Sequence, residues 1–206
     1  MLARRDHWIF DLDGTLTVAV HDFDAIRVAL GLPRGEPILE LLAALDPAEA
    51  APLRRRLDEI ELELARAARA ADGAHDLLAA LRSRGARVGI LTRNSHHNAL
   101  ETLARCGLQG HFSPTDVIAR DHGPLKPNPA GVHALLRAWR AAPSSAVMVG
   151  DYLYDLQAGR NAGTATVYVD VSGEFPFAEH ADLSVRGLTE LLPDARGARG
   201  EPTRTA

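Results

Sequence analysis

The sequence predicts an α/β protein whose core is a doubly wound parallel sheet that carries an inserted helical segment. Three observations lead to this fold class. From residue 85 onward, short apolar runs of strand length alternate with helical patterns, which is typical of a parallel sheet with helices on both faces. One further apolar run, at residues 8–10, precedes this region. The residues between them show helical periodicity without a strand pattern, so they are predicted to be a helical insert.

The first predicted element is a buried strand that ends at a polar loop. Its apolar run leads directly into Asp11, Asp13 and Gly14, within the stretch WIFDLDGTLT at residues 8–17. Since sites in open α/β sheets form at the carboxyl ends of strands, both carboxylates are expected to reach one small volume. They would repel each other unless a cation lay between them. The alternative interpretation is that Asp13 and Gly14 only form a turn.

The insert, residues 18–72, is predicted to form three helices. Apolar residues at helical spacing mark the first two, and a loop rich in proline and glycine separates them. Asp46 is followed by Pro47 and Glu49, a pattern typical of a helix start with Asp as the N-cap. The charged residues of the third helix, Glu61 among them, are expected to face solvent. Its apolar residues share one face, and they are Leu53, Leu57, Ile60, Leu64, Ala67 and Ala71.

Strands and helices then alternate to the end of the core. Gly85 is expected to end the first helix, Ser95 to cap the next, and Asn128 to cap a helix that starts at Pro129. A short helix near residue 190 follows the last strand. Residues 193–206 are polar and rich in arginine and glycine, which predicts a disordered tail. The predicted strands of this region cover residues 88–91, 117–119, 146–149 and 165–169.

Polar residues follow several of these strands or lie in the loops beside them. Thr92 and Asn94 follow the second predicted strand, Lys126 lies in a proline-rich loop, and Asp151 and Asp155 occupy a strand-to-helix turn. Each has an ordinary alternative when taken alone, such as a helix-entry threonine, a surface lysine or a first-turn carboxylate favoured by the helix dipole. Together with the carboxylates after the first strand, their order indicates one site at one edge of the sheet.

Lysine usage singles out one of these positions. The chain has 23 lysine and arginine residues in total, and Lys126 is its only lysine. Arginine replaces lysine on most solvated surfaces but not where a compact ammonium is needed. The alternative is that this lysine survives by chance.

Composition limits the class of protein. The 206 residues are 46% hydrophobic, enough for one medium domain or for a core domain with an insert. A net charge of −4 without a basic block argues against a nucleic-acid partner. The single cysteine, Cys106, excludes internal disulfides and suits a reducing compartment. No apolar run resembles a signal peptide or reaches membrane-span length, so we expect a cytoplasmic protein that does not use a membrane partner.

Four motifs in this order resemble those of the haloacid dehalogenase-like hydrolases. They are DLDGT at 11–15, ILTRN at 90–94, KPNP at 126–129 and GDYLYD at 150–155, and the similarity spans residues 7–192. The helical insert is similar to the small cap of the phosphoglycolate phosphatase-like branch. The resemblance implies a Rossmann-like core of residues 1–17 and 73–192 with a helical cap of residues 18–72. Tyr152 departs from the pattern, because many relatives have a small residue there.

The carboxylates support the chemistry of a phosphomonoesterase. A dianionic phosphomonoester repels an attacking carboxylate, and Mg²⁺ held by carboxylates shields it. Asp11 would be the nucleophile that forms an aspartyl-phosphate, and Asp13 would protonate the leaving oxygen and then deprotonate water. Asp11 and Asp151 would bind the metal, and Asp155 would contact it either directly or through a hydrogen bond. The resemblance implies that the main-chain carbonyl of Asp13 is a further ligand.

The remaining candidate residues concern the phosphoryl group and the leaving group. Thr92 and the main chain around Arg93 and Asn94 are expected to hold phosphate oxygens. Lys126 is expected to neutralise both the phosphoryl group and Asp11. By resemblance, cap loops contact the leaving group, which makes Arg34 and Glu36 candidates for specificity.

The expected activity is therefore a Mg²⁺-dependent phosphatase that acts on a small phosphorylated metabolite, with phosphoglycolate as the nearest family example. A dehalogenase would lack the second aspartate, and a phosphonatase needs a lysine in the cap, where this chain has none.

Two alternatives to a phosphatase remain. One is a phosphotransferase of the phosphoglucomutase kind, which must exclude water. The other is a protein that binds phosphorylated ligands without catalysis, because a fold does not guarantee an activity. The sequence leaves the oligomeric state open.

Overall fold

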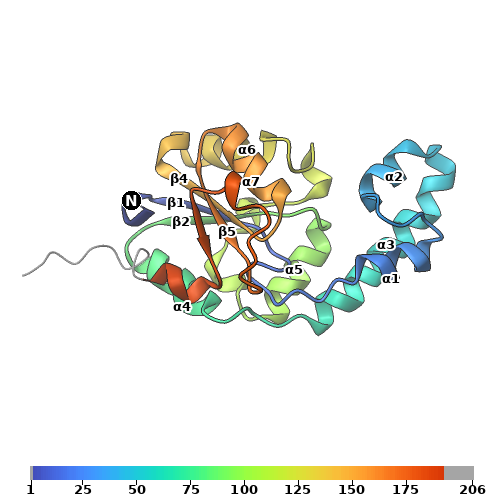
Figure 1. Ribbon diagram of the computed structural model, residues 1–206, viewed down its shortest axis with the longest axis horizontal. Helices are drawn as coiled ribbons and strands as arrows, with labels where there is room; N and C mark the ends of the chain where they lie inside the picture. The colour runs from blue at the N-terminus through green and yellow to red at the C-terminus, as the bar shows by residue number, and fades with distance from the viewer. Residues whose placement is uncertain (1, 193–206) are drawn as a thin grey trace, which may run out of the picture.

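Six parallel strands form one sheet in the order β3-β2-β1-β4-β5-β6 in the computed structural model, which describes residues 2–192 (Figure 1). From the central β1, the chain moves outward through β2 and β3, and then returns to the other side of β1 with β4. This order confirms the predicted doubly wound α/β class, and it opens a crevice at the carboxyl ends of β1 and β4. The strands are β1 (His7–Phe10), β2 (Arg87–Leu91), β3 (Val117–Ile118), β4 (Ala146–Gly150), β5 (Ala165–Val169) and β6 (Leu183–Val185).

Helices cover both faces of the sheet (Figure 1). Helices α4 (Ala74–Ser83) and α5 (His96–Arg105) lie on one face, and α6 (Ala130–Trp139) and α7 (Leu153–Ala162) lie on the other. Each face has its own apolar cluster, as the alternation of a central strand requires. Both faces of the sheet are therefore buried by helices.

The side chains of β1 pack into both apolar clusters. Trp8 and Phe10 pack with α4 and α5, whereas Ile9 packs with α6 and α7. All three side chains are fully buried. Burial of one such side chain stabilises a fold by roughly 1.5–3 kcal/mol, so β1 is a rigid support for the loop that follows it.

The insert forms a separate helical block beside the sheet (Figure 1). It contains α1 (Phe23–Leu30), α2 (Ile38–Ala44) and α3 (Pro47–Ala67). Its own apolar cluster is made by Ile26, Leu30, Ile38, Leu42 and Leu57. We propose that this block is the cap predicted for residues 18–72.

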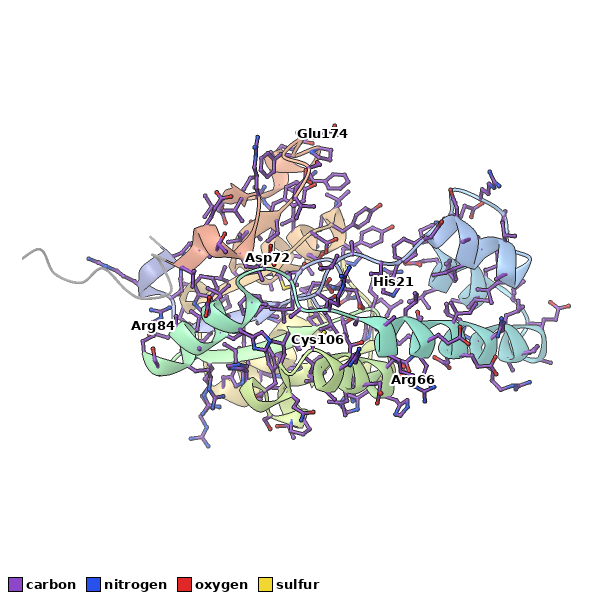
Figure 2. The ribbon with its side chains drawn as sticks, turned by 90° about the horizontal axis from the view of Figure 1, so that it is seen from below. His21, Arg66, Asp72, Arg84, Cys106 and Glu174 are labelled. Carbon is purple, nitrogen blue, oxygen red and sulfur yellow. The ribbon has the colours of Figure 1, made fainter. Side chains whose placement is uncertain are left out.

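Two chain segments connect the block with the sheet region. They pair through hydrogen bonds from Val18 N to Arg69 O (3.0 Å) and from Ala71 N to Leu16 O (2.9 Å). The pairing explains why α3 ends at Ala67 and not near Ala71 as the apolar spacing predicts, because the returning chain must adopt an extended conformation there. Figure 2 shows His21 at the junction between the block and the sheet region.

Local details of the core follow most of the sequence signals. Ser95 accepts a hydrogen bond from Asn98 N (3.3 Å), and Asp46 accepts one from Ala48 N (2.8 Å), so both cap their helices as predicted. Helix α6 starts at Ala130, one residue later than expected, although Asn128 Oδ1 still accepts a bond from Ala130 N (2.9 Å). The last predicted helix is a 3-10 turn, Leu188–Leu191.

The C-terminal part of the chain contains one strand that the sequence analysis missed and one predicted segment that cannot be compared. The sequence did not predict β6, because three residues in a polar region give too little periodicity to be distinguished from a loop. The predicted tail at residues 193–206 lies outside the described residues. Among residues 2–192, no helix combines the length and the apolar character that a membrane crossing requires.

Candidate active site

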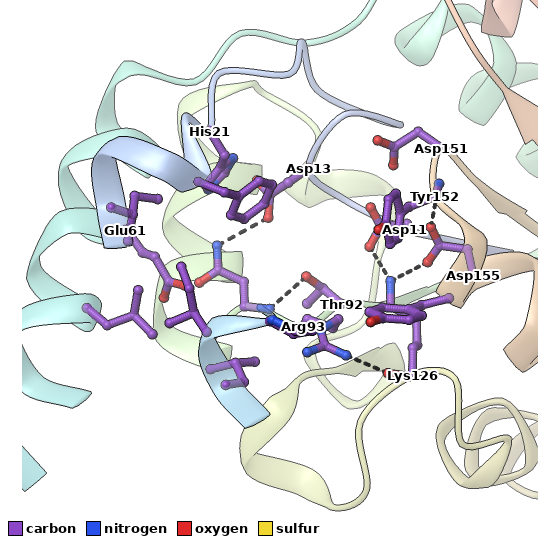
Figure 3. Close-up of a pocket in the computed structure, with 18 of the residues that line it drawn as sticks. Asp11, Asp13, His21, Glu61, Thr92, Arg93, Lys126, Asp151, Tyr152 and Asp155 are labelled. Carbon is purple, nitrogen blue, oxygen red and sulfur yellow. Dashed lines mark hydrogen bonds and ion pairs between the residues drawn. The ribbon is translucent and has the colours of Figure 1, made fainter. Parts of the chain in front are cut away.

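A cavity of about 320 Å³ lies where the carboxyl ends of the strands face the helical block (Figure 3). Asp11 follows β1, Thr92 follows β2 and Asp151 follows β4, so the sheet topology brings them to one edge. Every residue predicted to act in catalysis, phosphate binding or metal binding lines this cavity: Asp11, Asp13, Thr92, Arg93, Asn94, Lys126, Asp151 and Asp155.

Lys126 lies between two carboxylates at the sheet side of the cavity (Figure 3). Its Nζ donates hydrogen bonds to Asp11 Oδ1 and, over 2.5 Å, to Asp155 Oδ1. Only 3% of the Lys126 side chain is exposed, so solvent screens these contacts little. Burial alone would lower the pKa of Lys126, but the charges of Asp11 and Asp155 outweigh burial and raise it. The ammonium is therefore permanently charged at neutral pH.

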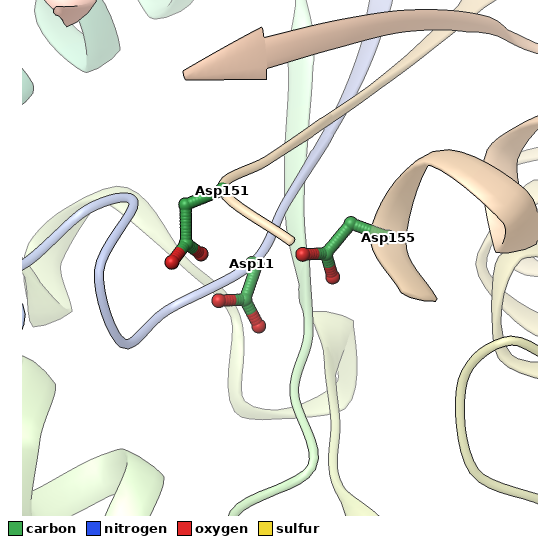
Figure 4. A group of neighbouring side chains, drawn as sticks. All are labelled: Asp11, Asp151 and Asp155. Atoms are coloured by element: carbon green, nitrogen blue, oxygen red, sulfur yellow. The ribbon is translucent and has the colours of Figure 1, made fainter. Parts of the chain in front are cut away.

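Three carboxylates, two of which bind this lysine, lie close together (Figure 4). Asp11, Asp151 and Asp155 each have a carboxylate oxygen within 4.8 Å of an oxygen from the other two. Burial raises the pKa of Asp155 to about 6, against the pull of Lys126. Burial also raises the pKa of Asp11 and, together with the charges of Asp11 and Asp155, raises that of Asp151 well above its usual value.

This carboxylate set fits a divalent cation. One ammonium opposes three close carboxylates, so the formal charges of this group leave an excess of negative charge. Hard oxygen ligands of this kind are those that Mg²⁺ prefers. Asp155 already accepts hydrogen bonds from Lys126 and from Tyr152 N (3.1 Å), which favours a role in positioning Lys126. Asp151 is oriented by Thr15 Oγ1, which donates to its Oδ1 over 3.0 Å.

Two glycines allow the carboxylates to approach. Gly14 has φ of +89°, and a Cβ there would lie 2.4 Å from Asp151 Oδ2. A Cβ at Gly150 would lie 2.2 Å from the Cβ of Asp155. Any larger residue at either position would push a carboxylate out of the cluster.

Asp13 lies in a different part of the cavity from Lys126. Its Oδ2 accepts a hydrogen bond from Asn94 Nδ2 over 3.2 Å, and its side chain is only partly buried. Asn94 N in turn donates to Thr92 Oγ1 over 3.1 Å, so the loop after β2 has a fixed shape. Figure 3 shows Asp13 away from Lys126, on the side of the helical block.

The side chain of Arg93 connects the loop after β2 with the helical block. Its Nη1 donates to Lys126 O over 2.6 Å, and its Nη2 lies 2.6 and 2.7 Å from the two carboxylate oxygens of Glu40 in α2. The guanidinium also lies 4.9 Å from the ring centroid of Tyr154. The side chain of Arg93 is therefore already engaged, which is compatible with the prediction that the main chain here holds phosphate oxygens.

The structure does not bring Arg34 and Glu36 into the cavity. Both side chains are exposed, and the lining contains their neighbours Gly35 and Pro37. The specificity role of Arg34 and Glu36 remains a prediction without support from their placement.

Several lining residues were not singled out by the sequence. Glu61 was expected to face solvent, but only 12% of its side chain is exposed, because both of its oxygens lie within 3.0 Å of the Arg120 guanidinium. Burial raises the pKa of Glu61, and Arg120 opposes this effect. The helical periodicity of α3 contained no signal for this pairing, since Arg120 comes from a distant loop. The other cavity residues of this kind include Phe23, Arg27 and Tyr154.

Comparisons with known proteins identify similar chains. A family model described as haloacid dehalogenase-like hydrolase matches residues 20–163. A haloacid dehalogenase-like hydrolase domain-containing protein of Arabidopsis thaliana is 30% identical, over 87% of this chain and 76% of its own. The N-acetylmuramic acid 6-phosphate phosphatase of Pseudomonas aeruginosa is also 30% identical, over 78% of this chain and 80% of its own. The crystal structure of a hydrolase from Pseudomonas syringae superposes with a TM-score of 0.77 at 22% identity, covering 91% of this chain and 96% of that one.

Proposed function

Because this chain belongs to the haloacid dehalogenase-like hydrolases, we propose that it is a Mg²⁺-dependent phosphatase of small phosphorylated metabolites that works through an aspartyl-phosphate. The P. aeruginosa relative, named as a phosphatase of a sugar phosphate, supports the reaction class. Family membership, which the four motifs predicted, is confirmed. The metal, the covalent intermediate and the substrate are the proposed parts.

One observation carries the proposal most directly. Asp11 sits at the end of β1 with its Oδ1 bonded to the buried ammonium of Lys126, while Asp151 and Asp155 complete a cation-sized oxygen cluster beside it. A carboxylate held between an ammonium and a metal site can approach a phosphate dianion, since both cations reduce the repulsion. Structural ion pairs alone would not require a third carboxylate, the partly buried Asp151, without an ion-pair partner beside them.

The first half-reaction would transfer the phosphoryl group to Asp11. One of its carboxylate oxygens attacks phosphorus, an O–P bond forms, and the bond between phosphorus and the leaving oxygen breaks. Asp13 would donate its proton to that leaving oxygen, so the product departs as an alcohol. The placement of Asp13 on the side of the helical block supports this role, because the leaving group must extend toward that block.

The second half-reaction would return the phosphoryl group to water. Asp13, now ionised, accepts a proton from a water molecule as that water attacks phosphorus. The bond from phosphorus to Asp11 breaks, which restores the Asp11 carboxylate and releases inorganic phosphate. General acid–base assistance of this kind contributes about 10²–10⁴ in rate.

Positive charge and hydrogen-bond donors around the phosphoryl group would supply the remaining stabilisation. Asp11 and Asp151 would hold Mg²⁺, with the Asp13 carbonyl added by family resemblance and Asp155 acting directly or by orienting Lys126. The bound metal would neutralise phosphate charge and orient the phosphoryl group. Lys126 would contribute a point charge on another side of it. Thr92 and the main chain around Asn94 would hold its oxygens.

The test is phosphate release from a panel of phosphomonoesters, with and without Mg²⁺. We expect metal-dependent release by the wild-type chain and its loss in Asp11→Asn, which preserves shape but removes the nucleophile. Phosphoglycolate belongs in the panel as the nearest family example. A hexose phosphate separates the phosphotransferase alternative, because a mutase returns an isomerised sugar phosphate, whereas a phosphatase releases free phosphate. Binding of Mg²⁺ and phosphate without any turnover would instead favour a non-catalytic role.

A further inference from the structure

We infer that the leaving group of the substrate carries an uncharged planar ring, and that Tyr152 and Phe23 contact this ring. The inference rests on the proposed phosphatase function and narrows its substrate class. The phosphoryl group fixes one end of the substrate at Asp11 and Lys126, so the rest of the cavity must receive the leaving group. Its chemistry can therefore be inferred from the side chains that line that remainder.

The lining beyond the carboxylates is mainly aromatic and aliphatic. Aromatic rings come from two separate segments that line the cavity. His21 and Phe23 belong to the chain that enters the helical block, and Tyr152 and Tyr154 belong to the loop and helix after β4. Figure 3 shows His21 and Tyr152 on different sides of the cavity. Aliphatic side chains of the block complete the lining, and they are Ile26, Ile38, Leu39 and Leu57. With a volume of about 320 Å³, the cavity falls in the size range of ordinary ligand pockets, about 300–1,000 Å³. A two-carbon acid such as glycolate would leave most of this apolar surface uncovered.

Two of the aromatic rings are unusually exposed. Phe23 is 57% exposed and Tyr152 is 50% exposed, and they are the only aromatic residues among the large exposed apolar residues of the described chain. Both line the same cavity. Exposed aromatic surface gathered at a cavity is typical of a binding site, and rings favour flat partners through stacked or edge-to-face contacts.

Neighbouring rings hold these two side chains in place. Tyr152 lies edge-on to Tyr154 (5.1 Å between centroids) and to Phe177 (5.3 Å). Phe23 stacks on His21 with centroids 5.7 Å apart. Little rotamer entropy is therefore lost when a ligand ring contacts them, which makes such contacts more favourable.

The charges of the cavity disfavour an anionic leaving group. The lining contains three basic side chains of Lys and Arg among the described residues, and each already has an acidic partner. Lys126 binds Asp11 and Asp155, Arg93 binds Glu40, and Arg27 binds Asp24 over 2.8 Å.

Glu61 adds a mostly buried carboxylate to this part of the cavity. Its partner Arg120 is shared with Asp58, which leaves this group of three with one excess negative charge. A carboxylate in the leaving group, as in phosphoglycolate, would therefore find repulsion and no available cation.

The experiment compares four phosphomonoesters of primary alcohols, so that leaving-group reactivity stays similar. Benzyl phosphate carries a planar ring, and cyclohexylmethyl phosphate has a ring of similar size that is not planar. Propyl phosphate is small and uncharged, and phosphoglycolate is small and anionic. The readouts are kcat/KM for phosphate release and, with Mg²⁺ present, Kd from calorimetry on the full-length Asp11→Asn variant, which binds the ester without consuming it.

We expect kcat/KM for benzyl phosphate to exceed that for cyclohexylmethyl phosphate about fivefold, as one aromatic contact predicts. Phosphoglycolate should be the poorest of the four in both readouts. Tyr152→Ala and Phe23→Ala should each lower the preference for benzyl over propyl phosphate by about fivefold. The matched control is Val28→Ala, because Val28 lies on the same helix as Phe23, is 63% exposed and does not line the cavity. Tyr152→Phe retains the ring and should retain the preference.

Several outcomes would overturn the inference. Phosphoglycolate could match or exceed benzyl phosphate, the two six-membered rings could be equivalent, or Val28→Ala could reduce the preference as much as Phe23→Ala. In each of these cases phosphate release would still support the phosphatase proposal. If no ester is hydrolysed, the phosphatase proposal fails, while the ranking of the four Kd values still tests the ring preference.

Discussion

Replacement of Lys126 by methionine tests how much the buried ammonium contributes to stability and activity. The change removes the ammonium but keeps an unbranched side chain of similar length. Asp11 and Asp155 would then lose their shared cationic partner. The cluster that they form with Asp151 would contain three carboxylates and no ammonium. At neutral pH we expect the stability of the metal-free protein and the activity of the Mg²⁺-loaded protein both to fall.

The magnitude follows from burial. The side chains of Lys126, Asp11 and Asp155 are 3%, 9% and 3% exposed, so solvent cannot replace the lost ammonium. Removal of one partner from a buried ion pair costs about 3–5 kcal/mol. Because Lys126 serves two carboxylates, we expect a loss in the upper part of that range. Loss of one charge-stabilising donor at a transition state lowers kcat by about 10²–10³.

The assay is urea denaturation of the wild-type chain and Lys126→Met, with and without Mg²⁺. We expect Mg²⁺ to stabilise the variant more than the wild type, because the metal replaces part of the missing positive charge. Lys126→Arg is the control that keeps the charge, and it should retain more stability than methionine but lose activity, since a planar guanidinium is not a compact point charge. If metal-free Lys126→Met lies within about 1 kcal/mol of the wild type, the buried ion pairs are not energetically significant and the reasoning is refuted.

Three further predictions concern neighbouring parts of the site. Gly14→Ala should weaken Mg²⁺ binding at least about tenfold by calorimetry, because its Cβ would displace the Asp151 carboxylate; unchanged affinity would remove Asp151 from the metal site. The pKa of Asp155 is about 6 in the folded chain and 3.8 for an ordinary aspartate, so between these values the folded chain binds more protons than the unfolded chain. The free energy of unfolding of the metal-free protein should therefore fall as pH rises from about 4 to about 6. Mg²⁺ should accordingly raise Tm more at about pH 7.5 than at about pH 5, and an equal rise at both would contradict proton displacement. Arg120→Ala should destabilise the chain by about 3 kcal/mol in denaturation, because it leaves Glu61 buried without a cation; an effect below about 1 kcal/mol would show that Glu61 becomes solvated.

The sequence predicted the carboxylate side of the cavity because that side is built from strand ends. Asp11, Thr92 and Asp151 each follow an apolar run directly, and a parallel sheet brings the carboxyl ends of such runs together. The places of these three residues at strand ends in the sequence therefore predicted that they lie close together in the structure. The only lysine of the chain pointed to the cationic partner for the same cluster.

The side of the cavity that faces the helical block could not be predicted in the same way, because it depends on contacts between distant segments. Glu61 is buried by Arg120, which lies 59 residues further along the chain. The loop after α1 turns Gly35 and Pro37 toward the cavity but leaves Arg34 and Glu36 exposed, and one sequence does not specify the direction of a loop. Tyr152 also lines the cavity, although the sequence marked it only as a departure from the family pattern.

The most direct test of the central claim is a rapid-quench experiment with a ³²P-labelled phosphomonoester and Mg²⁺. The proposed mechanism predicts a protein-bound label that is released by hydroxylamine, as an acyl phosphate is, and that maps to the peptide containing Asp11. Asp11→Asn should lose both the label and the turnover, while its near-ultraviolet circular dichroism remains that of the wild type. Wild-type rates of phosphate release by Asp11→Asn would contradict the assignment of Asp11 as the nucleophile.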